Sequence, residues 1–520
     1  MRIRQDDQLA GVLVSRRYGH PMPETPTKHE VLTALTFGAR VAEDEREELA
    51  DYFVETDQWE RVFSGRVDVI FGAKGAGKSA IYTSLMDRAA SFASSRILLT
   101  TAEKPRGNTV FQGLVANPPT SEIEFVAIWK LYFLTLIGST IVDKDMFGDD
   151  AQTVKDALFR EGLLAGSDAP LASRFRMVWD WIRQTVARVA PQAELRVDPA
   201  TQAPTVSFKI SLEEPSVPER HDGVVSIDDL LSTANQALAL NDSQVWILID
   251  RLDVAFSESR ELEANGIRAL FKAYLDMNEL DQISPKIFLR TDIWNEISAG
   301  GFREASHITK QLRIEWSSSS LLNLIVRRAV RAPHLTSYYS TSAANVLSSA
   351  WSQRSLFDGM VPEKVDVGRN PLTFEWILGR AQDGTKKPAP REVIHLLNEA
   401  RDAQVRMVER GEQDPPGVEL LSRAALREAL SPVSSVRLEQ TIYAEYPSEK
   451  PWIEALEGER TEQTTRTLAT AWGVDEETAR FRAQRLVDIG FLEARTAHGT
   501  PTYWVPFLYR PALGMRQGAA

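Results

Sequence analysis

The chain has 520 residues, of which 43% are hydrophobic and 25% charged, and this balance excludes a mainly disordered or fibrous protein. At roughly 100–200 residues per domain, the length accommodates about two to four domains. The formal net charge of -12 disfavours a general nucleic-acid coat or a membrane-surface binder, although it allows a local basic patch. The chain contains no cysteine, which excludes disulfides, thiolate metal sites, Cys nucleophiles and iron–sulfur clusters, and a cytoplasmic location is expected.

The N-terminal third begins with a segment rich in Pro and charge, residues 1–30, which we expect to be a loosely attached lead-in without the apolar run of a signal peptide. The stretch Leu35–Phe63 has a helical and strongly acidic pattern. Further along, Phe125–Val142 is apolar with one charge, Lys130. It is slightly shorter than the roughly 20 residues that span a membrane. Together with the central Lys, this length favours a buried core helix over a membrane helix.

The next elements alternate between strands and helices. The apolar run at 67–71 predicts a buried strand that ends in a Gly-rich turn, with a helix from about residue 78 and a strand at 97–101. Residues 121–190 look helical, and they precede a hairpin expected from 195–197 with 206–211 and a polar loop at 213–223. Then come a helix (227–240), a strand (245–249), a helix (260–277) and a strand (286–289). This alternation predicts an α/β layer with a parallel sheet and helices on both faces.

After about Trp316 the strand patterns stop and helical patterns take over, at 321–331, 343–351, 372–381 and 390–407. Pro-containing gaps at 413–417 and 431–432 lead into a distinct C-terminal segment. We therefore predict an N-terminal lead-in (1–30), a core (31–316) with a helical insertion around 121–225, a helical lid (317–430) and a C-terminal domain (433–520).

The strongest signal is a full match to G-x-x-x-x-G-K-[ST] between the first strand and its helix. The residues are Gly72, Ala73, Lys74, Gly75, Ala76, Gly77, Lys78 and Ser79. Glycines let the backbone wrap around a triphosphate, and the helix N-terminus adds its positive dipole end. Lys78 would reach the β- and γ-phosphates, and Ser79 would place a hydroxyl on Mg²⁺. The motif predicts a phosphate-binding loop for ATP.

A P-loop needs a carboxylate at the end of a neighbouring strand to hold Mg²⁺. Five apolar residues, 245–249, followed by Asp250 supply it, and we assign Asp250 to the metal side of the site. Many hydrolysing P-loop enzymes have Glu immediately after this Asp, but here the residue is Arg251. Asp253 is a candidate for the water-activating base and equally a candidate N-cap. We therefore expect slow turnover.

Basic side chains follow at three further places. Arg290 and Thr291 end the strand at 286–289, at the edge where ligands of open α/β sheets lie, so Arg290 is a candidate sensor of the γ-phosphate or a structural ion pair. Arg391 begins a helix in the all-α region and is a candidate lid arginine or a solvated side chain. Arg303 and Arg313 are candidate fingers for a neighbouring subunit. Trp59 and Phe63 are candidates for adenine contact, with core packing favoured.

The C-terminal segment has the element order of a winged helix: a helix at 465–474, a Gly turn, a helix at 476–489, and strands at 491–495 and 503–507. The second helix carries Arg480, Arg482 and Arg485, which are suited to phosphates. Its N-terminal end, where a DNA reader presents base contacts, carries Glu476 and Glu477 instead. A lid or protein-interaction role is favoured over binding of duplex DNA.

With these motifs in this order, the chain resembles the AAA+/STAND branch of bacterial P-loop ATPases, and most of all a FunZ-type family. The similar stretches lie between about 35 and 400 and include FGAKGAGKSAIY, ILIDRLD, FLRTDIW and PREVIHLLNEA. The resemblance implies Mg²⁺-dependent ATP binding at Gly72–Ser79 and Asp250, with possible self-assembly. Relatives on this branch often act in bacterial defence or signalling systems, and others load proteins onto DNA.

Three functions follow from these features. The first is a slowly hydrolysing ATP switch that assembles with itself or recruits a protein partner, since the chain shows no effector motif of its own. The second is a DNA-acting initiator or loader that grips duplex with its winged helix, and the third is a nucleotide binder without turnover. ATP and Mg²⁺ are the cofactors expected, and no membrane partner is expected.

Overall fold

The computed structural model describes residues 26–39, 53–102, 122–164, 177–185, 209–211, 224–250, 260–497 and 500–519. Several sequence predictions fall outside these residues. They are the acidic run at 43–48, the strand at 195–197, the loop at 213–223, and the pair Arg251 and Asp253.

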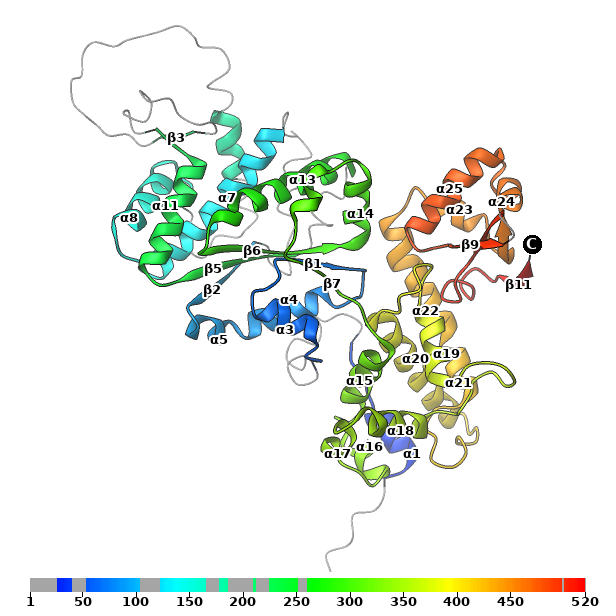
Figure 1. Ribbon diagram of the computed structural model, residues 1–520. Coiled ribbons are helices and arrows are strands. Elements are labelled where there is room, and N and C mark those ends of the chain that lie inside the picture. Colours follow the sequence, from blue (N-terminus) through cyan, green and yellow to red (C-terminus); the bar gives the residue numbers. More distant parts are fainter. Residues whose placement is uncertain are drawn as a thin grey trace, which may run out of the picture.

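A parallel five-stranded sheet in the order β2-β5-β6-β1-β7 forms the centre of the α/β part (Figure 1). Its strands are β1 (Val69–Gly72), β2 (Ile97–Thr101), β5 (Gln244–Ile249), β6 (Ile283–Arg290) and β7 (Gln311–Arg313). The predicted α/β class is confirmed. The strand β7 was not predicted, because it has three residues of which only Leu312 is buried, too few for a pattern.

Helices cover both faces of this sheet, which explains why its strands read as continuous apolar runs. Phe71 packs on one face among α7 (Glu122–Asp143), α8 (Asp149–Arg160), α11 (Ile227–Leu240), α13 (Arg260–Asp276) and α14 (Thr291–Ala299). Its neighbour Ile70 packs on the other face, with α3 (Asp57–Phe63), α4 (Lys78–Asp87) and α5 (Ala89–Ser94) (Figure 1). The alternation of Phe71 and Ile70 follows from the two-residue period of a strand.

The long apolar helix α7 is part of this core. It is the one helix of the described ranges that is long and apolar enough to cross a membrane, but 83% of its apolar window is buried inside the fold. Its Lys130 pairs with Asp228 at 2.8 Å and with Asp276 at 2.6 Å. Protein surrounds α7 and neutralises its central charge, as expected for a core helix.

One local prediction in the α/β part is wrong. The stretch 35–63 is not one helix: residues 35–39 and 53–56 are not helical, and the helices on either side are α1 (Lys28–Ala34) and α3. Thr27 and Thr56 cap these helices through their side chains, which fixes the two starts. The strand β3 (Lys209–Ser211) pairs in parallel with β4 (Val224–Ser226), and the other strand of the expected hairpin, 195–197, lies outside the described residues.

A second, helical core follows the α/β part. It contains α15 (Ser318–Ala329), α16 (Pro333–Tyr338), α17 (Ala343–Leu347), α18 (Ala350–Met360), α19 (Thr373–Ala381), α20 (Pro390–Glu409) and α21 (Arg423–Glu428). The helix predicted at 343–351 is two helices, because the side chain of Ser349 caps α18. The short helix α1 also packs here, with Val31 and Leu32 fully buried, although the sequence analysis grouped residue 31 with the α/β core.

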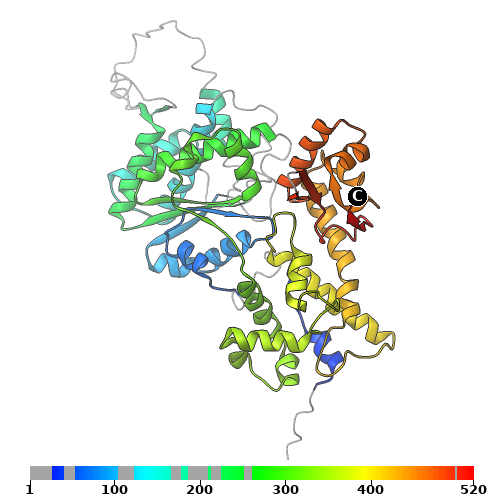
Figure 2. The ribbon, with the colours of Figure 1, turned by 45° about the vertical axis from the view of Figure 1, so that its right-hand side comes forward.

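The C-terminal elements lie beside the α14 side of the α/β part (Figures 1 and 2). Pro432 is not in a gap: it lies in the first turn of α22 (Leu430–Arg437), where a missing N–H costs no hydrogen bond. A π-helical turn η4 (Leu438–Tyr443) and α23 (Lys450–Glu454) follow. The remaining elements are β8 (Arg460–Thr464), α24 (Thr465–Trp472), α25 (Glu476–Asp488), β9 (Glu493–Ala497), β10 (Thr500–Trp504) and β11 (Arg516–Ala519).

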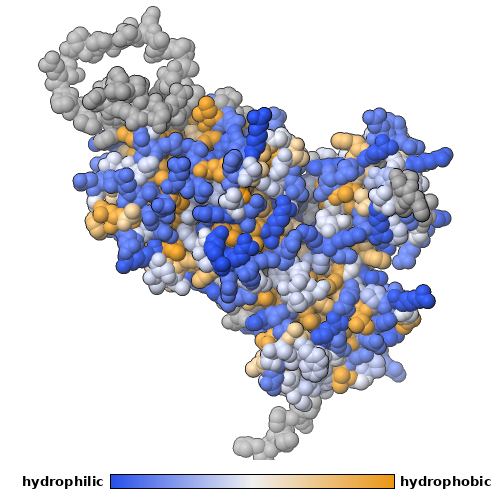
Figure 3. Space-filling view, viewed as in Figure 1, coloured by the Kyte–Doolittle hydropathy of each residue, from blue (hydrophilic) through white to orange (hydrophobic). Residues whose placement is uncertain are grey.

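The two helices and the antiparallel β9–β10 pair agree with the predicted order. The helices α24 and α25 join at Gly473, whose φ of 62° is left-handed. On the molecular face in Figure 3, small apolar patches are scattered among hydrophilic side chains.

Candidate phosphate-binding site at the carboxyl edge of the sheet

The P-loop connects β1 to α4: Gly72 is the last residue of the strand and Lys78 the first of the helix. Gly75 and Gly77 have φ angles of 79° and 100°, a region that residues with a side chain avoid. A Cβ on Gly75 would also lie 2.9 Å from Cβ of Arg391, so glycine is required there by close packing as well. The loop therefore curves at the N-terminus of α4, where free N–H groups and the helix dipole favour an anion.

Lys78 lies back over this loop. Its Nζ donates hydrogen bonds to the carbonyl oxygens of Gly72, at 2.9 Å, and Ala73, at 3.2 Å. The ring nitrogen of Trp316 donates to the carbonyl of Ala76 at 2.8 Å and supports the loop from its other side. The P-loop is thus held in a curved conformation with its lysine at the carboxyl end of β1.

The two residues that the sequence assigned to a metal are in contact. The Oγ of Ser79 donates to Oδ2 of Asp250 at 3.2 Å, although 171 positions separate them. Asp250 follows β5 and is 9% exposed. The strand β5 is not the expected neighbour of β1, because β6 lies between them in the sheet. The carboxyl ends of parallel strands meet at one edge of the sheet, which is why these side chains converge.

A hydroxyl and a carboxylate oxygen suit Mg²⁺, which takes few protein ligands and completes its shell with water and phosphate oxygens. Among the described residues, no group of three or more His, Asp or Glu side chains is arranged to hold a metal alone. The donor set therefore fits a Mg²⁺ that is held jointly by Ser79, Asp250 and a bound nucleotide.

Arg290 forms an ion-pair cluster in this structure. Its Nη2 lies 2.6 Å from Oδ2 of Asp292 and 2.5 Å from Oε2 of Glu445. The Tyr446 hydroxyl donates to Asp292 at 2.5 Å. The other oxygen of Glu445 pairs with Lys74 of the P-loop. Glu445 thus joins two cations at the carboxyl edge to the segment that follows η4.

The charge balance of this cluster appears in its pKa values. Burial alone would raise the pKa of Asp292, but the Arg290 guanidinium and the hydrogen bond from Tyr446 lower it to about 2. Burial would lower the pKa of Arg290, and Asp292 and Glu445 more than offset it, so the pKa is raised. Burial and the Asp292 charge raise the pKa of the Tyr446 hydroxyl. All three groups therefore keep their usual charge at neutral pH.

Arg391 is in the first turn of α20 and packs directly against Gly75, as the close approach described above shows. Its neighbour Glu392 pairs with the buried Arg437 of α22 at 2.7 Å. The start of α20 therefore connects the P-loop to the C-terminal elements. The sequence singled out Arg391 but not Glu392.

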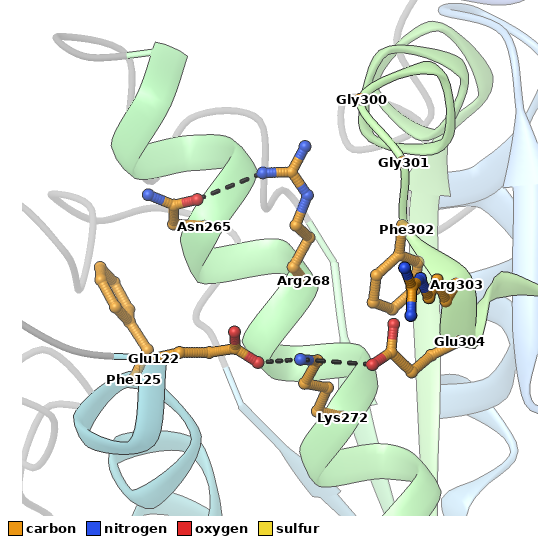
Figure 4. Close-up of a pocket in the computed structure, with 10 residues that line it drawn as sticks. All are labelled: Glu122, Phe125, Asn265, Arg268, Lys272, Gly300, Gly301, Phe302, Arg303 and Glu304. Atoms are coloured by element: carbon orange, nitrogen blue, oxygen red, sulfur yellow. Dashed lines mark hydrogen bonds and ion pairs between the residues drawn. The ribbon is translucent and has the colours of Figure 1, made fainter.

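The other candidates lie elsewhere. Trp59 is 2% exposed and packs with Phe63 and neighbouring aromatic rings, so these two residues serve core packing. Arg313 is exposed on the edge strand β7. Arg303 is exposed and lines a pocket of about 450 Å³ between α13, the start of α7 and the segment after α14 (Figure 4). Across that pocket, Lys272 pairs with Glu122 and, at 3.3 Å, with Glu304.

The arginines of α25 differ in what they contact. Arg485 pairs with Glu449 at 2.9 Å and reaches Glu296 of α14 at 3.8 Å. The guanidinium of Arg482 lies 5.1 Å from the ring centroid of Trp452, whereas Arg480 is exposed. Of these three arginines, which the sequence analysis found suited to phosphates, Arg485 is thus ion-paired and half-buried Arg482 contacts a ring.

Glu445, Tyr446 and Asp292 were not predicted. Asp292 stood next to a candidate sensor, which is a signal that could have been used. Glu445 and Tyr446 lie in a stretch without any motif, so only the folded chain brings them to the site.

No protein-family model and no curated protein match the chain. Solved structures match it distantly. The ORC1 protein of Aeropyrum pernix in complex with DNA is 12% identical, with 94% of this chain and 97% of that chain covered and a TM-score of 0.34. The ORC2 protein of the same organism (ADPNP-ADP complexes) is 11% identical, with 92% and 94% covered and a TM-score of 0.36.

A Walker-type ATPase of Pyrococcus abyssi is 9% identical, with 90% of this chain and 97% of that chain covered and a TM-score of 0.39. At TM-scores below 0.4, nothing is concluded about this chain from these likenesses. Membership of the FunZ-type family stays a prediction, since no family model matches.

Proposed function

We propose that the chain is a Mg²⁺-dependent ATP-binding switch that hydrolyses ATP slowly. The curved P-loop supports the binding of ATP, with Gly72–Ser79 around the phosphates. The contact of Ser79 with Asp250 supports a magnesium position beside the γ-phosphate. The expectation of slow turnover rests on Arg251, because many hydrolysing P-loop enzymes have Glu at this position, immediately after the metal-side Asp.

The contacts of Glu445 carry the switch part of this proposal. Its carboxylate bridges Lys74 and Arg290, two cations at the carboxyl edge where the phosphates of a bound nucleotide would lie. A carboxylate and a phosphate compete for the same kind of cation. ATP would replace Glu445 at Lys74 and Arg290, and the segment after η4 would move away from the α/β part. Nucleotide state would then set the position of the C-terminal elements, to which Arg391 and Glu392 add a second connection.

The finer assignments extend this proposal. We assign Asp253 to the water-activating base, Arg290 to sensing of the γ-phosphate, and Arg303 and Arg313 to contact with a neighbouring subunit. The proposal also includes a domain division at 31–316, 317–430 and 433–520, with a winged helix at the C-terminal end. It further includes a cytoplasmic location, self-assembly, and recruitment of a protein partner in a bacterial defence or signalling system. Arg290 is supported by its place at the carboxyl edge beside the P-loop lysine's partner Glu445, and the other assignments rest on the sequence and its resemblance.

The test is phosphate release from ATP with Mg²⁺, comparing the wild type with Lys78→Ala. We expect slow release by the wild type that the substitution abolishes, because Lys78 is the cation that would follow the β- and γ-phosphates. The exposed Lys310→Ala, which changes the same charge outside the P-loop, is the control and should keep the wild-type rate. Equal release by wild type and Lys78→Ala would refute an active site at the P-loop.

The alternative is a DNA-binding initiator or loader that uses the helix α25. The contacts of Arg485 weigh against this route, because its guanidinium pairs with Glu449 and reaches Glu296 within the protein. Arg480 and Phe481 are exposed, so this helix still offers a smaller surface for contact with DNA. A steep loss of duplex binding on Arg480→Gln would favour this alternative.

A further inference from the structure

A cluster of basic and aromatic side chains lies where the helical part meets the C-terminal elements, apart from the P-loop. Phe507 is at its centre: the guanidinium carbon of Arg380 lies 4.3 Å from the ring centroid, and that of Arg510 lies 3.9 Å away. Arg380 also lies 4.5 Å from the ring of Trp376 in α19. Residues from two parts of the chain thus hold two like charges against one ring. We call this group, with the neighbours described next, the arginine cluster.

Further cations surround this centre. Arg495 of β9 lies 4.0 Å from the ring of Trp504 in β10 and pairs with Glu493. Lys386 pairs with the same Glu493 at 2.8 Å. On the α19 side, Arg427 and Arg380 share one carboxylate, Asp366, at 2.9 Å and 3.4 Å. Glu493, through its hydrogen bond, and Glu462, through its negative charge, both raise the pKa of the Arg495 guanidinium.

The arginine cluster therefore has a surplus of positive charge in a chain whose net charge is -12. Its cations are Arg380, Lys386, Arg427, Arg495 and Arg510, and its carboxylates are Asp366, Glu462 and Glu493. Within the described part of the chain, Arg510 donates one hydrogen bond, from Nε to the carbonyl of Val505 at 2.8 Å. Burial together with Arg380 and Arg495 lowers its pKa to about 10.

The rings in the arginine cluster hold guanidinium groups instead of offering free faces to a base. A cation–π contact fixes the position of an arginine but leaves its positive charge in place. A carboxylate partner would neutralise that charge. The arginines are thus pre-positioned and still attract an anion. Repeated phosphates suit such a group better than a single carboxylate, because several fixed cations act together and guanidinium binds phosphate in a bidentate manner.

We propose that the arginine cluster binds the phosphate backbone of a nucleic acid, without reading its sequence. This site is distinct from the P-loop and from the outer face of α25, and the proposal does not rest on the proposed ATP switch. The arginine cluster is exposed enough to contact a nucleic acid, since Phe507 is 37% exposed and the Arg495 side chain is 44% exposed.

The test is fluorescence anisotropy of a labelled DNA duplex of mixed sequence, and of one of its single strands, at several salt concentrations. Arg510→Gln should weaken the binding of the full chain roughly tenfold, as expected for loss of a charge-assisted hydrogen bond. It should also reduce the slope of log affinity against log salt by about 1. Arg410→Gln is the matched control, since this exposed arginine pairs with Glu412 away from the cluster, and it should bind like the wild type.

A second variant guards against a folding defect. Arg495→Gln changes a side chain that is more exposed, and it should weaken binding in the same direction while its thermal unfolding stays that of the wild type. Phosphate release from ATP should be retained by both variants, which separates this proposal from the proposed function.

Equal affinities of Arg510→Gln, Arg495→Gln and Arg410→Gln would overturn the proposal, as would a wild type that binds neither probe at low salt. Unlabelled DNA should displace the probe far better than polyglutamate or inorganic phosphate at matched ionic strength. Displacement by polyglutamate as effective as by DNA would assign the cluster to acidic proteins instead, and equal displacement by inorganic phosphate would assign it to free phosphate.

Discussion

Two buried cations on the same strand, β6, have different kinds of partner. Lys286 is 1% exposed, and its Nζ lies 2.6 Å from Oδ1 of Asp68, 3.0 Å from the carbonyl of Val67 and 4.2 Å from the ring of Trp246. All these partners belong to the α/β part. Arg290, four positions further along, is 10% exposed and divides its hydrogen bonds between neighbouring Asp292 and Glu445, which is 155 positions away.

The difference lies in what would have to move to replace the partner. The Lys286 pair is enclosed by the sheet, and burial lowers the pKa of Lys286 more than Asp68 raises it. It would be lost only if the core opened. The Arg290 cluster forms where the C-terminal elements meet the edge of the sheet, and in the proposed switch a more highly charged anion would replace Glu445 while the sheet stays intact. One strand thus carries a cation that stabilises the fold and one that is suited to a switch.

The largest effect is expected from Lys286→Met, which leaves Asp68 without its closest cation. Breaking a buried ion pair costs about 3–5 kcal/mol, so the free energy of unfolding should fall by that order. Urea unfolding measures it. Lys310→Met is the control, because Lys310 lies 3.7 Å from the same carboxylate but is 54% exposed, and its loss should cost less than about 1 kcal/mol. If the free energy of unfolding fell equally in the two variants, the enclosed Lys286–Asp68 pair would contribute no more to stability than an exposed pair.

An intermediate effect is expected from Glu445→Gln, which removes the charge that competes with a nucleotide for Lys74 and Arg290. ATP should bind this variant roughly tenfold more tightly, by an amount on the order of one charge-assisted hydrogen bond, about 1.5 kcal/mol. Isothermal titration with an ATP analogue and Mg²⁺ measures the affinity. Glu439→Gln removes an exposed carboxylate from η4, close in the sequence, and should bind like the wild type. Unchanged affinity on Glu445→Gln would mean that Glu445 does not compete with ATP.

The third expected effect is a pH dependence of the Arg290 cluster. The pKa of Asp292 falls from its ordinary 3.8 to about 2 in the folded chain, so its contribution is present above about pH 4 and is lost as the pH falls toward 2. The difference in free energy of unfolding between the wild type and Asp292→Asn should therefore narrow over that interval. Urea unfolding at several pH values measures it. If the difference in free energy of unfolding between the two proteins stayed constant down to pH 2, the lowered pKa of Asp292 would be contradicted.

Much of the α/β part follows from its sequence because each element depends on its own residues. The helix at 227–240 and the strand at 97–101 have the expected bounds, since a short apolar run favours a strand and the amphipathic period favours a helix. The P-loop follows for the same reason: its glycines are required by local backbone geometry. The short edge strand β7 and the split between α17 and α18 were missed, because three residues or a single capping serine give too weak a signal.

The sequence by itself determined that the chain has an α/β core, a complete P-loop, a later apolar strand that ends in a carboxylate, and a helical region after about residue 316. These features depend on local periods and spacings. Only the tertiary structure decided that Glu445 pairs with Lys74 and Arg290, that α1 packs into the helical core, and that Arg380 and Arg510 meet at Phe507. Such contacts join residues far apart in the chain, and their energy comes from proximity and burial, which no local pattern encodes.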